Sequence, residues 1–456
     1  MRQAKFLKDV SSDSRKVLNR FMGGDFSGNV GQAIKNSSWQ LSTNVIAKIG
    51  SLMFTIILAR LLTPEVYGLY GLALSTILFL GVFSDLGLVS ALITFISKTI
   101  DKNSKKAKGY LYYITKLKLF LLSFASLILI VSARWIADSY YNKPIFYAIL
   151  AGALYLPIVH SGNWLSSLLI AKNNFRITFF KELILQITRL TIVPLSIIYL
   201  MKRVLVVDVF LFFVFIIISI CYFMTTIFLL IRLKQTKSIT KQKAEVLNSE
   251  EKKEMYKFVI PLSITALSGA FFGYIDIIML GRYVESAFIA YYQVAFNLIV
   301  SASAILGFMG IALLPIFSRI KNKESIKLFR KSRLILFLIS ILAVIFTLLV
   351  SRYLVLFVYG ADYLPAVFYL RIFSLLLISF PMIELYVSYY TSQRRTVLIA
   401  ISLLLSTVLN IVLNYIFINI GLKYGMDKAV LGACFATIIS RYVYLGILGI
   451  ARKIKR

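Results

Sequence analysis

A row of polar side chains interrupts an otherwise apolar stretch near the beginning of the chain. The residues are Gln40, Asn44, Lys48 and Ser51, spaced by four, four and three positions. Side chains three or four residues apart share one face of a helix, so this spacing predicts a single polar stripe. A lysine that faced lipid at such a depth would cost roughly 2.5–3.5 kcal/mol. We therefore expect Asn44 and Lys48 to face a polar cavity, where the ammonium group would bind an anion such as a phosphate.

Similar rows occur in other apolar stretches, and single charged residues accompany them. Polar stripes on several helices must face one another or water, so together they predict a wet cavity between the helices. The rows are Glu182–Gln186–Arg189, Gln293–Asn297–Ser301 and Ser402–Ser406–Asn410–Asn414, and the single residues are Asp276, Arg371 and Glu384. The residues expected to bind substrate are Asn44, Lys48, Arg189, Asp276, Gln293, Asn297, Asn410 and Asn414.

Structural interpretations compete with this one at several positions. Asn410 and Asn414 would also serve as hydrogen-bonding contacts between helices. Asp276 lies six positions before Arg282, so a structural ion pair is an alternative to a role in transport. The single histidine, His160, would either shuttle a proton or simply hydrogen-bond a neighbour such as Ser161. Arg441 is expected near a membrane interface.

The elements that carry these residues are predicted to be membrane-spanning helices. Hydrophobic residues make up 59% of the 456 residues, well above the roughly 45–50% of soluble domains. About 20 apolar residues span the hydrocarbon layer as a helix, whereas barrel strands need only about 9–11. The chain is therefore predicted to be an all-α integral membrane protein with twelve spans: 38–62, 67–97, 110–133, 144–170, 177–200, 207–232, 256–280, 286–317, 332–352, 363–390, 396–420 and 428–451.

The basic residues predict the orientation of these spans. Alternate loops and the two tails together hold 36 Lys and Arg residues, and the opposite set of loops holds nine. Because Lys and Arg are retained on the cytoplasmic side, both termini are expected in the cytoplasm and the protein in the cell membrane. The net charge of +32 is thus explained by topology, and a nucleic-acid partner is excluded.

A long polar loop divides the spans into two sets of six. The predicted parts are an N-terminal tail (1–37), a first bundle (38–232), a linker (233–255), a second bundle (256–452) and a C-terminal tail (453–456). The segment Ala59–Ala73 aligns with Gly281–Ala295, which places Arg60 on Arg282. Six spans separate the copies, so this is a parallel repeat about an axis along the membrane normal. Each copy is expected to form a short outer hairpin.

Several motifs resemble those of a known family. They are "ILARLLTPEVYGLYGLAL" followed by "FSDLGL" (Phe83–Leu88), "AKNNFR" (Ala171–Arg176), and the segment Val408–Val443 with its Asn, Gly, Ala and Ser positions. Their order and spacing resemble the polysaccharide-transporter flippases of the multidrug/oligosaccharidyl-lipid/polysaccharide exporter superfamily. The resemblance implies two six-helix bundles around a central cavity that opens alternately to each side. It also implies a polyprenyl- or dolichyl-linked oligosaccharide as substrate. Na+ and H+ both stay open as coupling ions, and the chain is expected to act as a monomer.

Three alternatives to an oligosaccharide flippase agree less well with the sequence. A cation-coupled multidrug and toxin extrusion (MATE) antiporter would favour carboxylates deep in the cavity, and only Asp85, Asp276 and Glu384 qualify. A membrane enzyme would need an acidic cluster or a large outer loop, and neither is seen, nor is any cofactor motif or metal-binding pattern. A lipid II flippase would more often have fourteen helices.

The predicted topology is tested by cysteine labelling in a background without Cys221 and Cys434. A cysteine introduced into the 233–255 loop should be unreachable for a membrane-impermeant maleimide in intact cells, whereas one at Asn142 should react. Lysed cells, in which both positions react, provide the control. Labelling of the 233–255 loop in intact cells would contradict the orientation.

Overall fold

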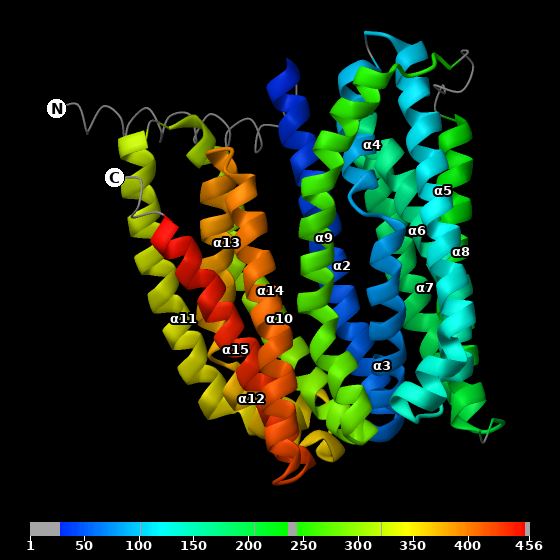
Figure 1. Ribbon diagram of the computed structural model, residues 1–456, viewed down its shortest axis with the longest axis vertical. Helices are drawn as coiled ribbons and strands as arrows, with labels where there is room; N and C mark the ends of the chain where they lie inside the picture. Colours follow the sequence, from blue (N-terminus) through cyan, green and yellow to red (C-terminus); the bar gives the residue numbers. More distant parts are fainter. Residues whose placement is uncertain (1–27, 101, 205, 236–243, 321, 452–456) are drawn as a thin grey trace.

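The computed structural model describes residues 28–451 except 101, 205, 236–243 and 321, and these residues are almost entirely helical (Figure 1). No strand occurs in the described part of the chain, which confirms the all-α prediction. Eleven described helices are long and apolar enough to cross a membrane, and a bent helix pair makes a twelfth span. The protein is therefore a multi-pass membrane protein, as predicted.

The first six spans are formed by helices α2 to α8 and two short segments. Their bounds are α2 Gly28–Leu61, α3 Pro64–Gly81, η1 Val82–Ser84, α4 Leu88–Thr99, α5 Ser104–Arg134, η2 Trp135–Tyr141, α6 Phe146–Ala171, α7 Phe175–Met201 and α8 Val207–Gln235.

The remaining spans are formed by helices α9 to α15. Their bounds are α9 Ser249–Tyr283, α10 Ser286–Arg319, α11 Asn322–Val358, η4 Ala361–Tyr363, α12 Ala366–Phe373, α13 Leu376–Ser392, α14 Thr396–Leu422 and α15 Met426–Ala451. The first turn of α2 and the last turn of α15 lie at one end of the molecule, here called the termini end (Figure 1). The α2–α3 and α9–α10 turns lie at the opposite end, here called the hairpin end.

Two spans that the sequence predicts as continuous are broken. The second span changes from α3 to α4 through Leu86 and Gly87, whose φ angles are 44° and 80°. A left-handed backbone ends a right-handed helix, and glycine adopts it without steric cost. The tenth span bends by 43° between α12 and α13. Hydropathy alone does not reveal either break, because the residues on both sides of it are apolar.

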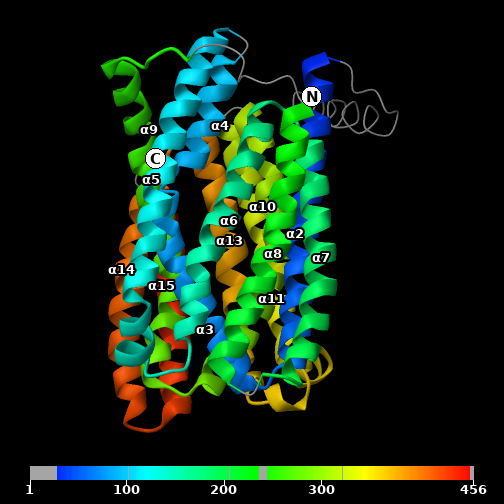
Figure 2. The ribbon, with the colours of Figure 1, turned by 90° about the vertical axis from the view of Figure 1, so that its right-hand side faces the viewer.

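The ends of the predicted parts also differ from the structure. Residues 28–37 belong to α2 rather than to a tail, while the rest of the predicted N-terminal tail and residues 453–456 lie outside the described residues. Helix α9 begins within the predicted linker because Asn248 and Glu251 form a capping box. The termini end of α9 lies beside α5 (Figure 2), where the Tyr113 and Tyr256 hydroxyls are 2.8 Å apart. The division into two bundles stays a prediction.

The two halves of the chain meet closely at the hairpin end. The Arg60 guanidinium donates to the carbonyls of Val358, at 2.8 Å, and Phe357. The Tyr363 hydroxyl donates to the Leu62 carbonyl at 3.2 Å. Arg60 thus interrupts an apolar stretch because it closes the free carbonyls at the end of α11.

Glycines allow α3 and α10 to approach each other at this end. A Cβ atom at Gly68 would collide with the Ser286 carbonyl, and one at Gly71 would collide with the Gln293 side chain. Gly421 and Gly432 play the same part between α14 and α15, where a Cβ would meet backbone atoms of Lys428 and Phe417. Small residues bring helix backbones together in membranes, where association depends on close packing rather than on the hydrophobic effect.

We expect Gly68→Val to open the hairpin-end contact between α3 and α10, because the new side chain overlaps the Ser286 backbone. A cysteine pair at Leu62 and Tyr363 would report the change through a lower disulfide yield in membranes. Gly273→Val is the matched control, since nothing lies within 4 Å of a Cβ at that position. An unchanged disulfide yield in Gly68→Val would contradict the role of the glycine.

Candidate substrate and ion sites

A pocket lies between α2 and α10, one helix from each half of the chain. It has a volume of about 520 Å³. Its polar lining comes from Lys48 and Ser51 on α2 and from Asn297 and Ser301 on α10, while the remaining lining residues are mostly apolar. Two of the latter, Ile49 and Ile305, are largely exposed, as expected for side chains at an opening towards lipid. The polar stripe predicted on α2 therefore faces α10 across this pocket.

The predicted residues near this pocket differ in how they contact it. The Lys48 side chain is exposed in the pocket. Asn297 lines the pocket and hydrogen-bonds the buried Tyr67 hydroxyl. Asn44 is exposed one helical turn before Lys48 on α2, and it accepts a hydrogen bond from Gln40 at 3.2 Å. Gln293 is buried instead against Gly71, at the contact between α10 and α3.

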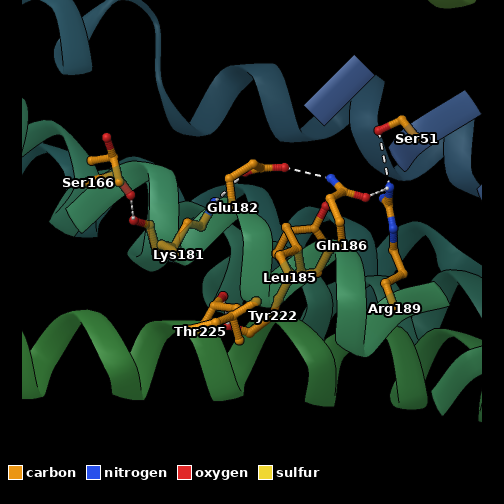
Figure 3. Close-up of polar contacts among 12 residues, drawn as sticks. Ser51, Ser166, Lys181, Glu182, Leu185, Gln186, Arg189, Tyr222 and Thr225 are labelled. Carbon is orange, nitrogen blue, oxygen red and sulfur yellow. Dashed lines mark hydrogen bonds and ion pairs between the residues drawn. The ribbon is translucent and has the colours of Figure 1, made fainter. Parts of the chain in front are cut away.

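Arg189 belongs to a chain of polar contacts that joins α7 to α2 (Figure 3). Its guanidinium donates to the Ser51 hydroxyl at 3.1 Å and to the Gln186 amide oxygen at 2.7 Å. Gln186 in turn donates to Glu182 at 2.6 Å, and Lys181 pairs with the same carboxylate at 3.3 Å. Glu182 is therefore buried and paired with a lysine of its own helix. Ser51 connects this network directly to the pocket lining.

The guanidinium of Arg189 also lies 4.4 Å from the centre of the Phe54 ring. Its Nε atom is buried and has no hydrogen-bond partner among the described residues. Only 8% of the Arg189 side chain is exposed, so the residue lies behind the pocket wall rather than in the open pocket. Arg189 is thus placed to orient Ser51 and to add positive potential to the pocket.

Asp276, Asn410 and Asn414 lie together in a second, closed site. The Asp276 carboxylate accepts hydrogen bonds from Tyr292 at 2.6 Å, from Thr437 and from Asn414. Asp276 is 5% exposed and the two asparagines are fully buried. The ion pair between Asp276 and Arg282, considered as an alternative, is wrong, because Arg282 lies instead over the Tyr140 ring at 5.0 Å.

Three amide atoms in this closed site lack a hydrogen-bond partner among the residues that the structure describes. They are both polar side-chain atoms of Asn410 and the Oδ1 atom of Asn414. Buried polar atoms without a partner are uncommon and call for a bound water or ion. Together with the carboxylate and the two hydroxyls, these oxygens are the ligand type that hard cations prefer. The site is separate from the pocket, and its role stays a prediction.

The sequence alone did not connect Arg441 with Glu384. The Arg441 guanidinium lies 3.6 Å from the centre of the Phe272 ring and 4.9 Å from that of Phe380, not at an interface as expected. Glu384 is exposed, and Lys48 and Arg441 are the cations that act on it electrostatically. The two residues come from α13 and α15, which a single-helix pattern does not connect.

A third polar group was also missed. Lys118 is 3% exposed and pairs with Asp85 at 2.9 Å, and its ammonium lies 3.3 Å from His160 Nδ1. Because the ammonium can only donate, His160 accepts at Nδ1. Asp85 directly follows η1 at the break between α3 and α4, so the pair fixes this break to α5.

Comparison with known families decides the classification. Residues 33–321, more than half of the chain, match the family model described as polysaccharide biosynthesis protein. The chain belongs to this family. A search of curated proteins finds no match.

Solved structures share the fold of this family member at low sequence identity. A lipid II flippase MurJ in an inward closed conformation has a TM-score of 0.67 at 17% identity, covering 90% of this chain and 86% of that one. An inward-facing multidrug resistance MATE transporter has a TM-score of 0.68 at 14% identity, covering 89% and 94%. An outward-facing MATE transporter has a TM-score of 0.58 at 13% identity, covering 92% and 95%.

These findings confirm the predicted superfamily and its fold. The chain is a multi-pass membrane protein of the polysaccharide biosynthesis family, and it shares the fold of flippase and transporter structures of the multidrug/oligosaccharidyl-lipid/polysaccharide exporter superfamily. Its family and structural neighbours are transporters and flippases, so the prediction that it is not an enzyme is confirmed. Within the described residues, no three His, Cys, Asp or Glu side chains gather as a metal site.

Proposed function

We propose that this transporter flips a lipid-linked oligosaccharide from the cytoplasmic to the outer leaflet, and that the α2–α10 pocket holds its phosphate group. The exposed Lys48 side chain in the pocket between α2 and α10 carries this proposal. A polyprenyl or dolichyl (pyro)phosphate is the class of substrate, and one chain suffices because both walls of the pocket belong to it. The match to polysaccharide biosynthesis proteins supports the same substrate class.

The charges around the pocket suit an anionic substrate. Lys48 and Arg441 both act on Glu384, so this carboxylate balances their charge. A phosphate in the pocket would compete with Glu384 for Lys48, and charge-assisted hydrogen bonds are roughly twice as strong as neutral ones. Arg189, held by Ser51 and Gln186, adds a fixed positive charge behind the wall. The polar amides of Asn44 and Asn297 would contact the glycan.

The open side of the pocket suits a lipid tail. The tail would pass between Ile49 and Ile305 and remain in hydrocarbon while the head group crosses. The closed hairpin end, where Arg60 and Tyr363 join the two halves, leaves the pocket to be loaded from the other side. The higher similarity to the inward-facing MATE structure than to the outward-facing one supports this view.

Export of a cationic drug is the second candidate function, since multidrug transporters share the fold. An organic cation in the pocket would face Lys48, and no carboxylate is among the described residues that line the pocket. Like charges at short range repel and disfavour binding. The pocket therefore favours the anionic substrate.

Substitutions of Lys48 test the proposed function. Lys48→Ala should lower glycan export about tenfold or more, because a hydrogen bond to a charged group contributes roughly 1.5–3 kcal/mol. Lys48→Arg should retain part of the export, and Lys48→Glu should have the lowest, since it repels phosphate. The measurement is surface glycan in a flippase-deficient strain, normalised to the amount of transporter in the membrane.

Lys116 provides the matched control for this series. It is an exposed lysine on α5 that does not line the pocket, so Lys116→Glu should leave export unchanged. Full export by Lys48→Glu would exclude a phosphate contact. If Lys48→Glu abolished the efflux of organic cations and left glycan export unchanged, the result would favour the drug antiporter instead.

We infer that a coupling ion, Na+, binds at the closed site around Asp276. The carboxylate, the Thr437 and Tyr292 hydroxyls and the unpartnered amide oxygens of Asn410 and Asn414 offer oxygen ligands from four helices. A proton would need the carboxylate alone and would leave the amide oxygens unexplained. Ion binding would draw α9, α10, α14 and α15 together, and it would thereby bias the conformation of this half.

Sodium should stabilise the purified wild-type protein against heat relative to equal concentrations of potassium or choline. At about ten times the dissociation constant the gain is about 1.4 kcal/mol. Asp276→Asn should lose this sodium-specific gain, whereas Asp138→Asn, at an exposed ion pair with Arg134, should keep it. Equal stabilisation by all three cations would exclude a sodium site.

A further inference from the structure

A groove separate from the pocket and the closed site lies on the outer surface of the helices, between α7 and α8. Its volume is about 530 Å³. It is lined by the first turns of α7 and the last turns of α8, at the termini end of the molecule, through Arg176, Phe180, Ile184, Phe228, Arg232 and Gln235. Arg176 belongs to the "AKNNFR" motif, to which the proposed function gives no role.

The groove combines two guanidinium groups with aromatic rings. Arg176 lies 5.7 Å from the centre of the Phe180 ring, and Arg232 lies 5.4 Å from that of Phe228. Arg232 also donates to the uncharged Gln235 side chain at 3.1 Å. Each ring keeps its guanidinium close to the groove, and a guanidinium can bind a phosphate with two parallel hydrogen bonds.

The charged residues of the groove lie at the ends of the spans and its apolar residues lie deeper, in the same order as the head group and acyl chains of a phospholipid. Arg176 is the second residue of α7 and Arg232 is in the last turn of α8, so both guanidinium groups lie at the ends of membrane spans. Ile184 lies two helical turns deeper and, with the two rings, provides an apolar floor. The first turn of α7 has no side-chain cap, so the positive end of its dipole also faces this level.

We propose that this groove binds the head group of an anionic glycerophospholipid, such as phosphatidylglycerol, from the leaflet at the termini end. The phosphate lies between the two guanidinium groups, and the first part of an acyl chain covers Phe180, Ile184 and Phe228. Basic pockets between membrane helices on the cytoplasmic side bind anionic head groups in this way. A free phosphate would leave the apolar floor uncovered, and a neutral lipid would lack the net negative charge that two guanidinium groups attract.

A bound lipid would join α7 to α8 at this end of the molecule. Helix α7 also carries the network from Lys181 to Arg189 that contacts Ser51 of α2. The lipid is therefore a structural ligand of the first half and should stabilise it without entering the α2–α10 pocket. The inference does not depend on which substrate is transported.

The test measures lipid binding and heat stability of the purified, delipidated full-length protein. Phosphatidylglycerol, phosphatidylcholine and inorganic phosphate are added separately, the retained lipids are identified by native mass spectrometry, and the melting temperature is recorded. Phosphatidylglycerol should be retained and should raise the melting temperature of the wild type. The Arg176→Gln/Arg232→Gln variant should retain at least about tenfold less phosphatidylglycerol, and the lipid should not raise its melting temperature.

Two further variants keep the test decisive. Arg394→Gln/Arg395→Gln removes the same number of charges between α13 and α14, outside the groove, and should behave as the wild type. Arg176→Lys/Arg232→Lys retains the charge, so it can be tested even if the Gln variant does not fold. It should bind phosphatidylglycerol more weakly than the wild type. Equal stabilisation by phosphatidylcholine or by inorganic phosphate would overturn the proposal. Unchanged retention of phosphatidylglycerol in both groove variants would also overturn it.

Discussion

Hydrocarbon does not solvate charge, and every ionised or amide side chain within a membrane span must find its partners inside the protein. In this chain several of these partners come from different helices. Arg189 of α7 reaches Ser51 of α2, Lys118 of α5 reaches Asp85 at the α3–α4 break, and Asn414 of α14 reaches Asp276 of α9. Each polar cluster therefore also fixes how two or more helices lie against each other, and the arrangement of the spans follows from these contacts.

The clusters divide into accessible and closed groups, and this division separates their possible roles. Lys48 and Glu384 are exposed within the molecule, so a substrate of variable shape can contact them. Asp276, Asn410 and Asn414 are almost completely buried, which suits a small ion and excludes a glycan. Burial also strengthens electrostatic interactions, because the local dielectric constant is low. The same residue types, placed at different depths, thus support different chemistry within one transporter.

The contact between the halves at the hairpin end combines hydrogen bonds and glycines with buried aromatic side chains, among them Tyr67, which packs against Tyr363. It depends on backbone carbonyls that accept from Arg60 and Tyr363, and on glycines that bring α3 to α10. Opening this end would break these hydrogen bonds and expose the aromatic side chains. A transporter that opens alternately to the two sides needs states that differ by only a few kcal/mol. By contrast, the α14–α15 contact at Gly421 and Gly432 lies within one half and needs no such reversibility.

The sequence by itself determined the helical class, the number of spans, the superfamily and the face of α2 that carries Lys48. Long apolar stretches and a spacing of three or four residues are local properties, so they can be read without a structure. It did not reveal the breaks at Leu86–Gly87 and between α12 and α13, because long apolar stretches lie on both sides of each change in backbone direction. Only the tertiary structure separated Lys48 from Asp276, moved Gln293 to the α3–α10 contact and brought Arg441 inside. These differences have one physical reason: a polar stripe shows which way a helix faces, whereas burial and partners depend on the helices that pack against it.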